Sequence, residues 1–313
     1  MKRAFVFPGQ GSQAPGMGKA LAGAFPTARL LFEEVDDALS QRLSRIMFEG
    51  PESELMLTEN AQPALLAVSL AVIRVLQSDA SFEIGRQAAF VAGHSLGEYS
   101  ALAAAGTFTV SDAARLVKRR GQAMQKAVPV GEGAMAALLG LEIDAAREVA
   151  QAAGRDGVCA VANDNSAGQI VVSGHRAAVE RAVALAAERG ARRSIMLPVS
   201  APFHCPLMQP AADVMAEALG EITLREPAPP IVPNVTAAPT TDPEEIKELL
   251  VEQVTRMVRW RETVTVFAEN QVEEVVEIGA GRVLAGLVKR IDRSLTASSV
   301  GAPAEVEDLM QRL

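Results

Sequence analysis

Three short apolar runs in this sequence each end at a turn that contains glycine, and they lie at residues 4–7, 88–92 and 275–278. The second and third turns lead into helical patterns at residues 98–105 and 282–291. Short strands that are apolar throughout are typical of a parallel sheet with both faces buried, and their alternation with helices favours the same arrangement. The sequence therefore predicts an α/β fold with a parallel sheet covered by helices.

The middle of the chain has a different order of elements. Strand and helix patterns follow one another as βαββαβ, the order of a split-βαβ, ferredoxin-like unit. The strands are expected at residues 134–139, 158–162, 169–173 and 192–197, and the helices at residues 144–153 and 176–189. Residues 163–168 are expected to form the loop between the second and third strands. We predict a large α/β-hydrolase-like domain, residues 1–128 and 198–313, with an inserted ferredoxin-like small domain, residues 129–197.

Composition and charge exclude several classes of protein. The 313 residues are 49% hydrophobic, yet no apolar run approaches the roughly 18 residues that cross a bilayer, and the apolar start is too short for a signal peptide. Cys159 and Cys205 make no disulfide framework, and no metal-ligand spacing is present. The net charge of -8 argues against nucleic acid as a partner. We expect a cytoplasmic enzyme with no metal and no membrane partner.

Residues 93–97, Gly-His-Ser-Leu-Gly, fit the G-x-S-x-G nucleophile elbow. In that motif a sharp strand-to-helix turn exposes a serine hydroxyl, and here an apolar run ends directly before the motif and a helical pattern follows it. Ser95 is therefore the candidate nucleophile. The alternative is a tight turn with an N-capping serine.

The sequence offers only three histidines as a base for that serine. His94 adjoins Ser95 on the tight turn, so its ring should point away from the hydroxyl. His175 is better explained as capping a helix start. His204 follows a strand in a loop made stiff by prolines, where bases are usually presented, so it is the candidate base by elimination. Cys205 beside it is expected to be a small buried residue.

One arginine falls on an apolar helix face. In the helical pattern from residue 111 to about 126, Arg120 shares the face of Ala113, Leu116, Val117 and Met124. A guanidinium there is costly unless a carboxylate or hydrogen-bond acceptors meet it. Arg120 either has a structural role, in an ion pair or as a snorkelling side chain, or binds a substrate carboxylate through two parallel hydrogen bonds.

The turn at residues 8–11, Pro-Gly-Gln-Gly, has two interpretations. It formally matches G-x-G-x-x-A, a dinucleotide fingerprint, but the acidic residues about 20 positions on lie in a helical pattern and not at a strand end. These residues are Glu33, Glu34, Asp36 and Asp37. We therefore interpret the turn as the source of a backbone N–H opposite the elbow, half of an oxyanion hole.

Several segments together resemble the malonyl-CoA:acyl carrier protein transacylase family of bacterial fatty acid synthesis. They are residues 7–13, 93–102, 120–121, 198–208, 234–235 and 277–284. The resemblance covers essentially the whole chain in order, and the family's ferredoxin-like subdomain fits the inserted unit.

The resemblance implies a role for each matching residue. Ser95 would carry the acyl group and His204 would be its base, oriented by the backbone carbonyl of Gln253 in place of an acid. The oxyanion donors would be the backbone N–H groups of Leu96 and Gln10. The substrate contacts would come from Arg120, which would bind a carboxylate, and from Gln10, His94 and Phe203, whose bulk resembles a malonyl-selective pattern.

The first function hypothesis is transfer of a malonyl group from malonyl-CoA to the phosphopantetheine thiol of acyl carrier protein, by a ping-pong cycle with no bound cofactor. A serine thioesterase or esterase, which admits water, is the alternative, and a nucleotide-binding or scaffold module around residues 9–11 is the third hypothesis. An acidic carrier protein would need a local basic surface. We expect that surface at Lys289 and Arg290, with Arg189, Arg192 and Arg193 as the alternative.

Overall fold

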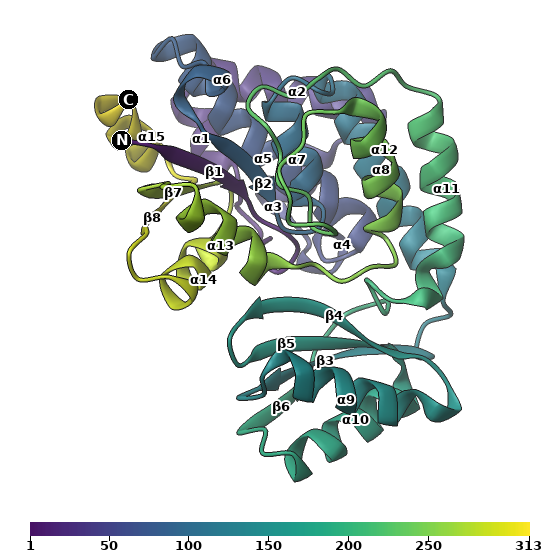
Figure 1. Cartoon of the computed structure of the whole chain (residues 1–313). Helices are drawn as coiled ribbons and strands as arrows, with labels where there is room; N and C mark the ends of the chain where they lie inside the picture. Colours follow the sequence, from purple (N-terminus) through teal and green to yellow (C-terminus); the bar gives the residue numbers. More distant parts are fainter.

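The computed structural model describes all 313 residues and contains two sheets, one parallel and one antiparallel (Figure 1). The parallel sheet has the strand order β2-β1-β7-β8, and the antiparallel sheet has the order β4-β5-β3-β6. The strands are β1 Arg3–Phe7, β2 Phe90–Gly93, β3 Gly133–Leu139, β4 Cys159–Ser166, β5 Gln169–His175, β6 Arg193–Met196, β7 Glu274–Ile278 and β8 Thr296–Val300. The predicted fold class, a parallel-sheet α/β part with a separate smaller part, is confirmed.

Helices cover both faces of the parallel sheet. In β1, Phe5 and Phe7 belong to the larger apolar core, whereas Ala4 and Val6 belong to a second core on the opposite face. This alternation follows from the period of two along a strand. The helices packed around this sheet are α1 Lys19–Ala24, α2 Pro26–Leu39, α3 Leu43–Glu49, α4 Glu52–Leu55, α5 Thr58–Asp79, α6 Ile84–Gln87, α7 Gly97–Ala104, α8 Val110–Ala127, α11 Gln209–Gly220, α12 Pro243–Glu252, α13 Trp260–Glu269, α14 Val283–Ile291 and α15 Pro303–Arg312.

Helix α5 is the longest of the helices that the sequence patterns did not predict, which also include α1, α3, α4, α6, α11, α12, α13 and α15. It is 22 residues long, and it is the one helix long and apolar enough to cross a bilayer by length and composition. Of its most apolar stretch, 83% is buried inside the protein, so it is a core helix. A helix enclosed on nearly all sides has no polar face, and the 3.6-residue alternation that reveals surface helices is therefore weak.

The antiparallel sheet is covered on one face by α9, Ile143–Ala153, and α10, Arg176–Glu188. The observed order βαββαβ is the predicted one. One segment differs from expectation, because residues 163–166, predicted as a loop, continue β4 with two register shifts. The hairpin turn is therefore only residues 167–168. The predicted domain boundaries, after 128 and after 197, fall between α8 and β3 and just beyond β6.

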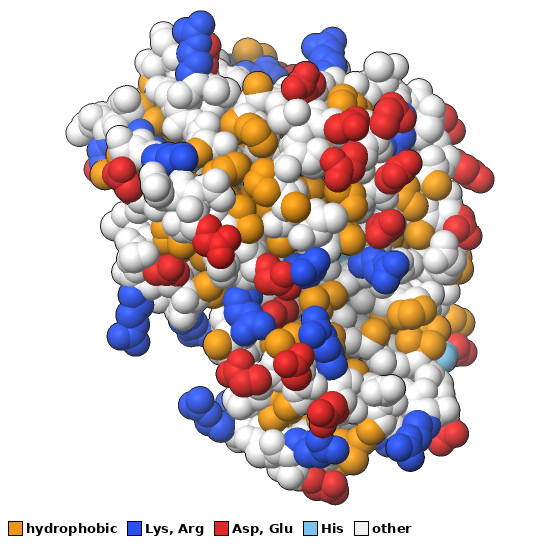
Figure 2. Space-filling model, viewed as in Figure 1, with side chains coloured by type: hydrophobic (Ala, Val, Ile, Leu, Met, Phe, Trp, Pro, Cys, Tyr) orange, Lys and Arg blue, Asp and Glu red, His pale blue; other side chains and the backbone are white.

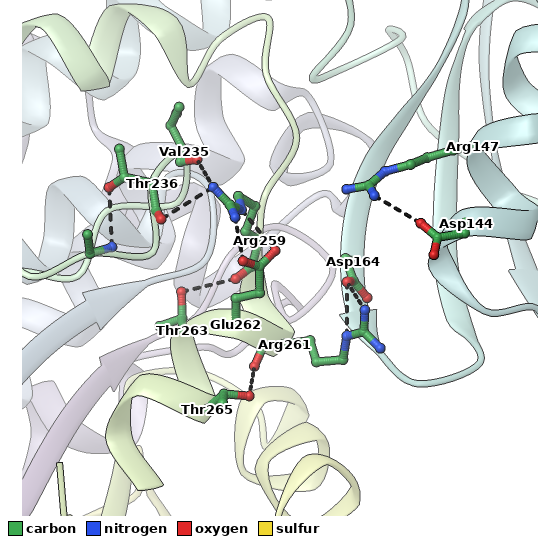
Figure 3. A network of polar contacts seen from close by, with 11 residues as sticks. Asp144, Arg147, Asp164, Val235, Thr236, Arg259, Arg261, Glu262, Thr263 and Thr265 are labelled. Carbon is green, nitrogen blue, oxygen red and sulfur yellow. Dashed lines mark hydrogen bonds and ion pairs between the residues drawn. The ribbon is translucent and has the colours of Figure 1, made fainter. Parts of the chain in front are cut away.

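The polar end of β4 joins the two parts of the molecule, which explains why it is a strand. The backbone N–H of Val258 donates to the carbonyl of Ala162 at 2.9 Å, and the N–H of Asp164 donates to the carbonyl of Val258 at 3.0 Å. Arg261 on α13 pairs with the buried Asp164 carboxylate at 2.8 Å (Figure 3). These contacts hold β4 against the segment that enters α13.

Candidate active site

The sharp turn between β2 and α7 carries Ser95 at its tip. Its φ of 54° lies in the left-handed region that side chains rarely adopt. A Cβ on Gly93 would lie 1.8 Å from the carbonyl carbon of Gly97, and a Cβ on Gly97 would lie 2.1 Å from the carbonyl oxygen of Phe7. The turn therefore requires both glycines. Helix α7 receives no side-chain cap, which removes the N-capping interpretation of the serine.

His204 is brought to Ser95 from 109 positions away in the chain. Its Nε2 lies 2.8 Å from Ser95 Oγ, and its Nδ1 lies 2.8 Å from the backbone carbonyl oxygen of Gln253. Since a carbonyl can only accept, Nδ1 carries the proton and Nε2 presents its lone pair to the hydroxyl. Burial, and after it the positive charge of Arg120, lowers the pKa of His204 to about 3. The imidazole is therefore neutral at neutral pH, as a general base must be.

The other two histidines are engaged elsewhere. His94 Nε2 lies 2.8 Å from Asn165 Oδ1 on β4, so its ring points away from Ser95 and links the elbow to the antiparallel sheet. His175 occupies the N-cap position of α10, but its ring does not cap that helix, contrary to expectation. Its Nδ1 instead accepts the backbone N–H of Val158 at 2.9 Å. Cys205 is fully buried, as expected of a small core residue.

Arg120 on α8 is 1% exposed and reaches the nucleophile. Its Nη2 donates to Ser95 Oγ at 3.1 Å and to Gln253 Oε1 at 2.9 Å, and its Nη1 donates to Gln62 Oε1 at 2.8 Å. These partners are two amides and a hydroxyl and not a carboxylate, and Nε of Arg120 has no partner. Arg120 is therefore neither part of a direct ion pair nor a snorkelling side chain. A buried guanidinium without a directly bound counter-ion, next to a nucleophile, suits an anionic group on a substrate.

The turn at residues 8–11 is connected to the guanidinium of Arg120 through side-chain hydrogen bonds. Thr58 Oγ1 donates to Gln10 Oε1 at 2.7 Å, and Gln62 Nε2 donates to Thr58 Oγ1 at 3.0 Å, so both residues of α5 connect Gln10 with Arg120. The backbone N–H groups of Gln10 and Leu96 donate to no group of the protein. The acidic residues considered for a dinucleotide site lie within α2, as expected, and this leaves the fingerprint without its acidic partner.

Two residues whose side chains the motif analysis did not single out hold the elbow in place. Asn234 Oδ1 accepts the N–H of Ser95 at 2.7 Å, and its Nδ2 donates to the carbonyl of Gly93 at 2.6 Å. Arg259 in turn fixes the Asn234 segment through the carbonyls of Val235 and Thr236 (Figure 3). The sequence carries no local signal for such a clamp, because its parts lie about 140 positions apart.

A cleft of about 740 Å³ opens beside His204, between β4 and α9 on one side and residues 204–209 and 255–257 on the other. Arg147 and Arg256 line it, and Figure 2 shows Lys and Arg side chains gathered in the band between the two parts. The half-buried Phe203, directly before His204, is not among the residues that line the cleft and packs against the large core.

The two expected docking residues lie outside this cleft. Lys289 lines a separate groove of about 370 Å³ between α14 and β8, and Arg290 donates to Gln169 Oε1 at 3.0 Å. Helix α14 packs against β4, and this places Arg290 beside the β4–β5 hairpin.

Comparisons with known proteins agree with this geometry. The model of the acyl transferase domain family matches residues 4–312. A malonyl CoA-acyl carrier protein transacylase of Bacillus subtilis is 46% identical over all of this chain and 97% of its own length. The crystal structure of an acyl-carrier-protein S-malonyltransferase from Bartonella henselae has a TM-score of 0.97 and 54% identity, covering 100% of this chain and 99% of its own.

A further solved structure is a type II PKS acyl-carrier protein in complex with its malonyl-transacylase. It has a TM-score of 0.96 and 42% identity, and covers 100% of both chains. Identity at this level over the whole length, together with the matching family model, is decisive. The chain belongs to the acyl transferase domain family, among the malonyl CoA-acyl carrier protein transacylases.

Proposed function

We propose that this protein transfers a malonyl group from malonyl-CoA to the phosphopantetheine thiol of acyl carrier protein and so supplies fatty acid biosynthesis. One observation carries the proposal: Arg120, buried and without a directly bound carboxylate, donates to the same Ser95 Oγ that lies 2.8 Å from His204 Nε2. The names of the relatives point to the same two substrates.

In the first half-reaction, His204 Nε2 takes the Ser95 proton as Oγ attacks the thioester carbonyl. The backbone N–H groups of Leu96 and Gln10 stabilise the negative charge that develops on the carbonyl oxygen. The carbon–sulfur bond then breaks, and the coenzyme A thiol leaves with the proton that His204 returns. Arg120 holds the free carboxylate of the malonyl group during these steps.

In the second half-reaction the same groups act in reverse. His204 takes the proton of the carrier's phosphopantetheine thiol, the sulfur attacks the malonyl ester, and Ser95 Oγ leaves with the proton. This is a ping-pong cycle through a malonyl-serine intermediate. The steps use only groups of the chain and its two substrates, so we propose that no bound cofactor is needed, and we place the reaction in the cytoplasm.

The alternative is a serine thioesterase or esterase, which would use Ser95 and His204 in the same way but admit water. Arg120 favours transfer of a carboxylated acyl group, since a general esterase has no need of a buried cation at the nucleophile. Phe203 supports selectivity for malonyl, because bulk directly before the base His204 disfavours an α-methyl substituent.

The carrier protein must bind where its arm can reach Ser95. We propose Lys289 and Arg290 as its docking surface, supported by the position of Arg290 beside the β4–β5 hairpin. The competing surfaces are the small-part cations Arg189, Arg192 and Arg193, and the cleft arginines Arg147 and Arg256.

The proposal is tested by intact-protein mass after mixing with malonyl-CoA. The wild-type chain should gain one malonyl group, and Ser95→Ala should show no gain, because no other group holds the nucleophile's position. The control is Ser100→Ala, a buried serine on α7 outside the site, which should be malonylated as the wild type is. A full mass gain in Ser95→Ala would place the acyl group elsewhere and contradict the mechanism.

A further inference from the structure

Glu98 lies one helical turn below the nucleophile and has no role in the steps above. It is the second residue of α7, a helix that is otherwise apolar or small, and it is 1% exposed. A buried carboxylate is costly unless hydrogen bonds or an opposite charge compensate it. Its place in the first turn of a helix is favourable, since the dipole stabilises negative charge there. Like Arg120, Glu98 is a charged residue on an apolar helix face.

The contacts of Glu98 reach two parts of the site. Its Oε2 accepts the backbone N–H of Asn234 at 2.9 Å and the side-chain Nε2 of Gln253 at 2.9 Å. Asn234 clamps the elbow through Ser95 N–H, and Gln253 orients His204 through its backbone carbonyl. One carboxylate oxygen therefore supports both the turn that carries the nucleophile and the residue that orients the base.

The side chain of Gln253 also lies between two opposite charges. Its Oε1 accepts from Arg120 Nη2 at 2.9 Å, and its Nε2 donates to Glu98 Oε2 at 2.9 Å. The amide dipole thus has its negative end at the guanidinium and its positive end at the carboxylate, which is the favourable orientation for both. The polar contacts of Arg120 are with two amides and a hydroxyl, so Glu98, through the amide of Gln253, is its counter-charge in the core.

We propose that Glu98 is a positioning residue of the transferase, whose ionised carboxylate fixes Gln253 and Asn234 and balances the charge of Arg120. The proposal rests on the proposed function above. Glu98 touches no substrate; it acts through the amide of Gln253, which sets Arg120 on one side and His204 on the other.

The ionised form should be the active one, and this gives a pH signature. Burial raises the pKa of Glu98 to about 7, against the opposing effect of its two hydrogen bonds and of Arg120. Of the ionisable groups on β1, β2, α5 and α8, the elements packed against α7, only Arg120 shifts this pKa. Tyr99, its neighbour on α7, has a raised pKa, and His204 has a pKa of about 3, so neither changes charge near pH 7. Activity should therefore fall as the pH drops through about 7.

The test is the single-turnover rate of Ser95 malonylation between pH 5.5 and 8.5, followed by intact mass, for the wild type, Glu98→Gln and Glu98→Asp. Glu98→Gln keeps an oxygen that accepts both hydrogen bonds but removes the charge. We expect malonylation to be on the order of ten-fold slower at pH 8, since charge-assisted hydrogen bonds are about twice as strong as neutral ones. The decline below pH 7 should also disappear in this variant. Glu98→Asp keeps the charge and should keep the decline, at a lower rate.

Glu277→Gln is the matched control. Glu277 on β7 is also fully buried, also accepts a backbone N–H, here that of Ala285 in the first turn of α14 at 2.8 Å, and also has a pKa raised by burial. It contacts none of the site residues. Its variant should keep the wild-type rate and pH profile.

Each outcome decides one question. A wild type that is not malonylated contradicts the proposed function itself. A malonylated wild type with Glu98→Gln matching Glu277→Gln in rate and profile overturns the role of Glu98 alone. If Glu98→Gln does not fold, Glu98→Asp decides, because its shorter side chain moves the carboxylate away from Gln253 and Asn234: slower malonylation than the wild type at pH 8 supports the role, and the wild-type rate overturns it.

Discussion

The two sheets differ in where they keep their polar side chains. Around the parallel sheet, buried polar groups gather at the carboxyl ends of β1 and β2, and they include Glu98, Arg120 and Gln253. The core of the antiparallel sheet consists of eleven buried residues that are all apolar. Its buried polar residues lie mainly on β4, where Asn163 and Asp164 face the other part of the molecule.

We infer from this difference that the reaction depends on the polar region and that the antiparallel core contributes mainly to stability. In the first region each polar group is held by another polar group from a distant segment, so one substitution disturbs several others. In the second region the contacts are local and apolar, so a substitution should change the free energy of unfolding and leave the rate at Ser95 alone. Substitutions in the two regions can therefore test the division.

The largest effect is expected from Arg120→Ala. It should slow malonylation of Ser95 roughly a hundred-fold or more, because removing one partner of a desolvated charge pair costs about 2–5 kcal/mol. Acetylation by acetyl-CoA should stay constant or rise, since acetyl has no carboxylate. Rates with the two donors from quenched reactions give the measurement. Arg119→Ala is the control, because Arg119 pairs only with Glu217 and Glu221 at the surface. Equal losses with both donors would assign Arg120 a structural role.

A smaller effect of a different kind is expected from Val172→Ala in β5, which is fully buried in the antiparallel core. The free energy of unfolding should fall by about 1–3 kcal/mol, because a buried methyl pair is lost and a cavity remains. Malonylation at 25 °C should be unchanged. Denaturant titration and intact mass measure the two quantities, and Val130→Ala, at an 82% exposed site, is the control. A slowed malonylation would show that the two regions are coupled more tightly than their cores suggest.

The smallest effect is expected at the surface. Lys289→Glu with Arg290→Glu should raise the KM for the carrier protein a few-fold and flatten its salt dependence, while malonylation by malonyl-CoA is unchanged. The comparison pair is Arg147→Glu with Arg256→Glu in the cleft beside His204. If only the cleft pair raises the KM for the carrier, docking belongs to the band between the two parts and not to α14.

Local patterns were sufficient for much of the fold. The strands of both sheets except β8, the elbow and the buried face of α8 follow from short apolar runs, from the 3.6-residue period of a helix and from glycine positions. Strand β8, Thr296–Val300, escaped prediction because it is a polar edge strand without an apolar run. Helix α5 escaped because it is enclosed, and the end of β4 because its polar residues are paired with a distant segment.

Some residues of the candidate site could likewise be predicted from local patterns, and others could not. Ser95 and Arg120 could be found from their own helix and turn, and His204 by elimination among three histidines. The side-chain roles of Asn234 and Gln253 could not, because only the folded chain brings residues 234 and 253 beneath the elbow. Glu98 does carry a local signal, a charge within an otherwise apolar or small helical pattern.

The left-handed backbone at the elbow also restricts the chemical nature of the nucleophile. Ser95 has a φ of 54°, and a residue branched at Cβ is strongly disfavoured in that region. Threonine, a secondary alcohol, would place its methyl group against the same turn that brings Gly93 and Gly97 into contact. The turn therefore selects a primary alcohol: the geometry that exposes the hydroxyl also decides which hydroxyl amino acid can supply it.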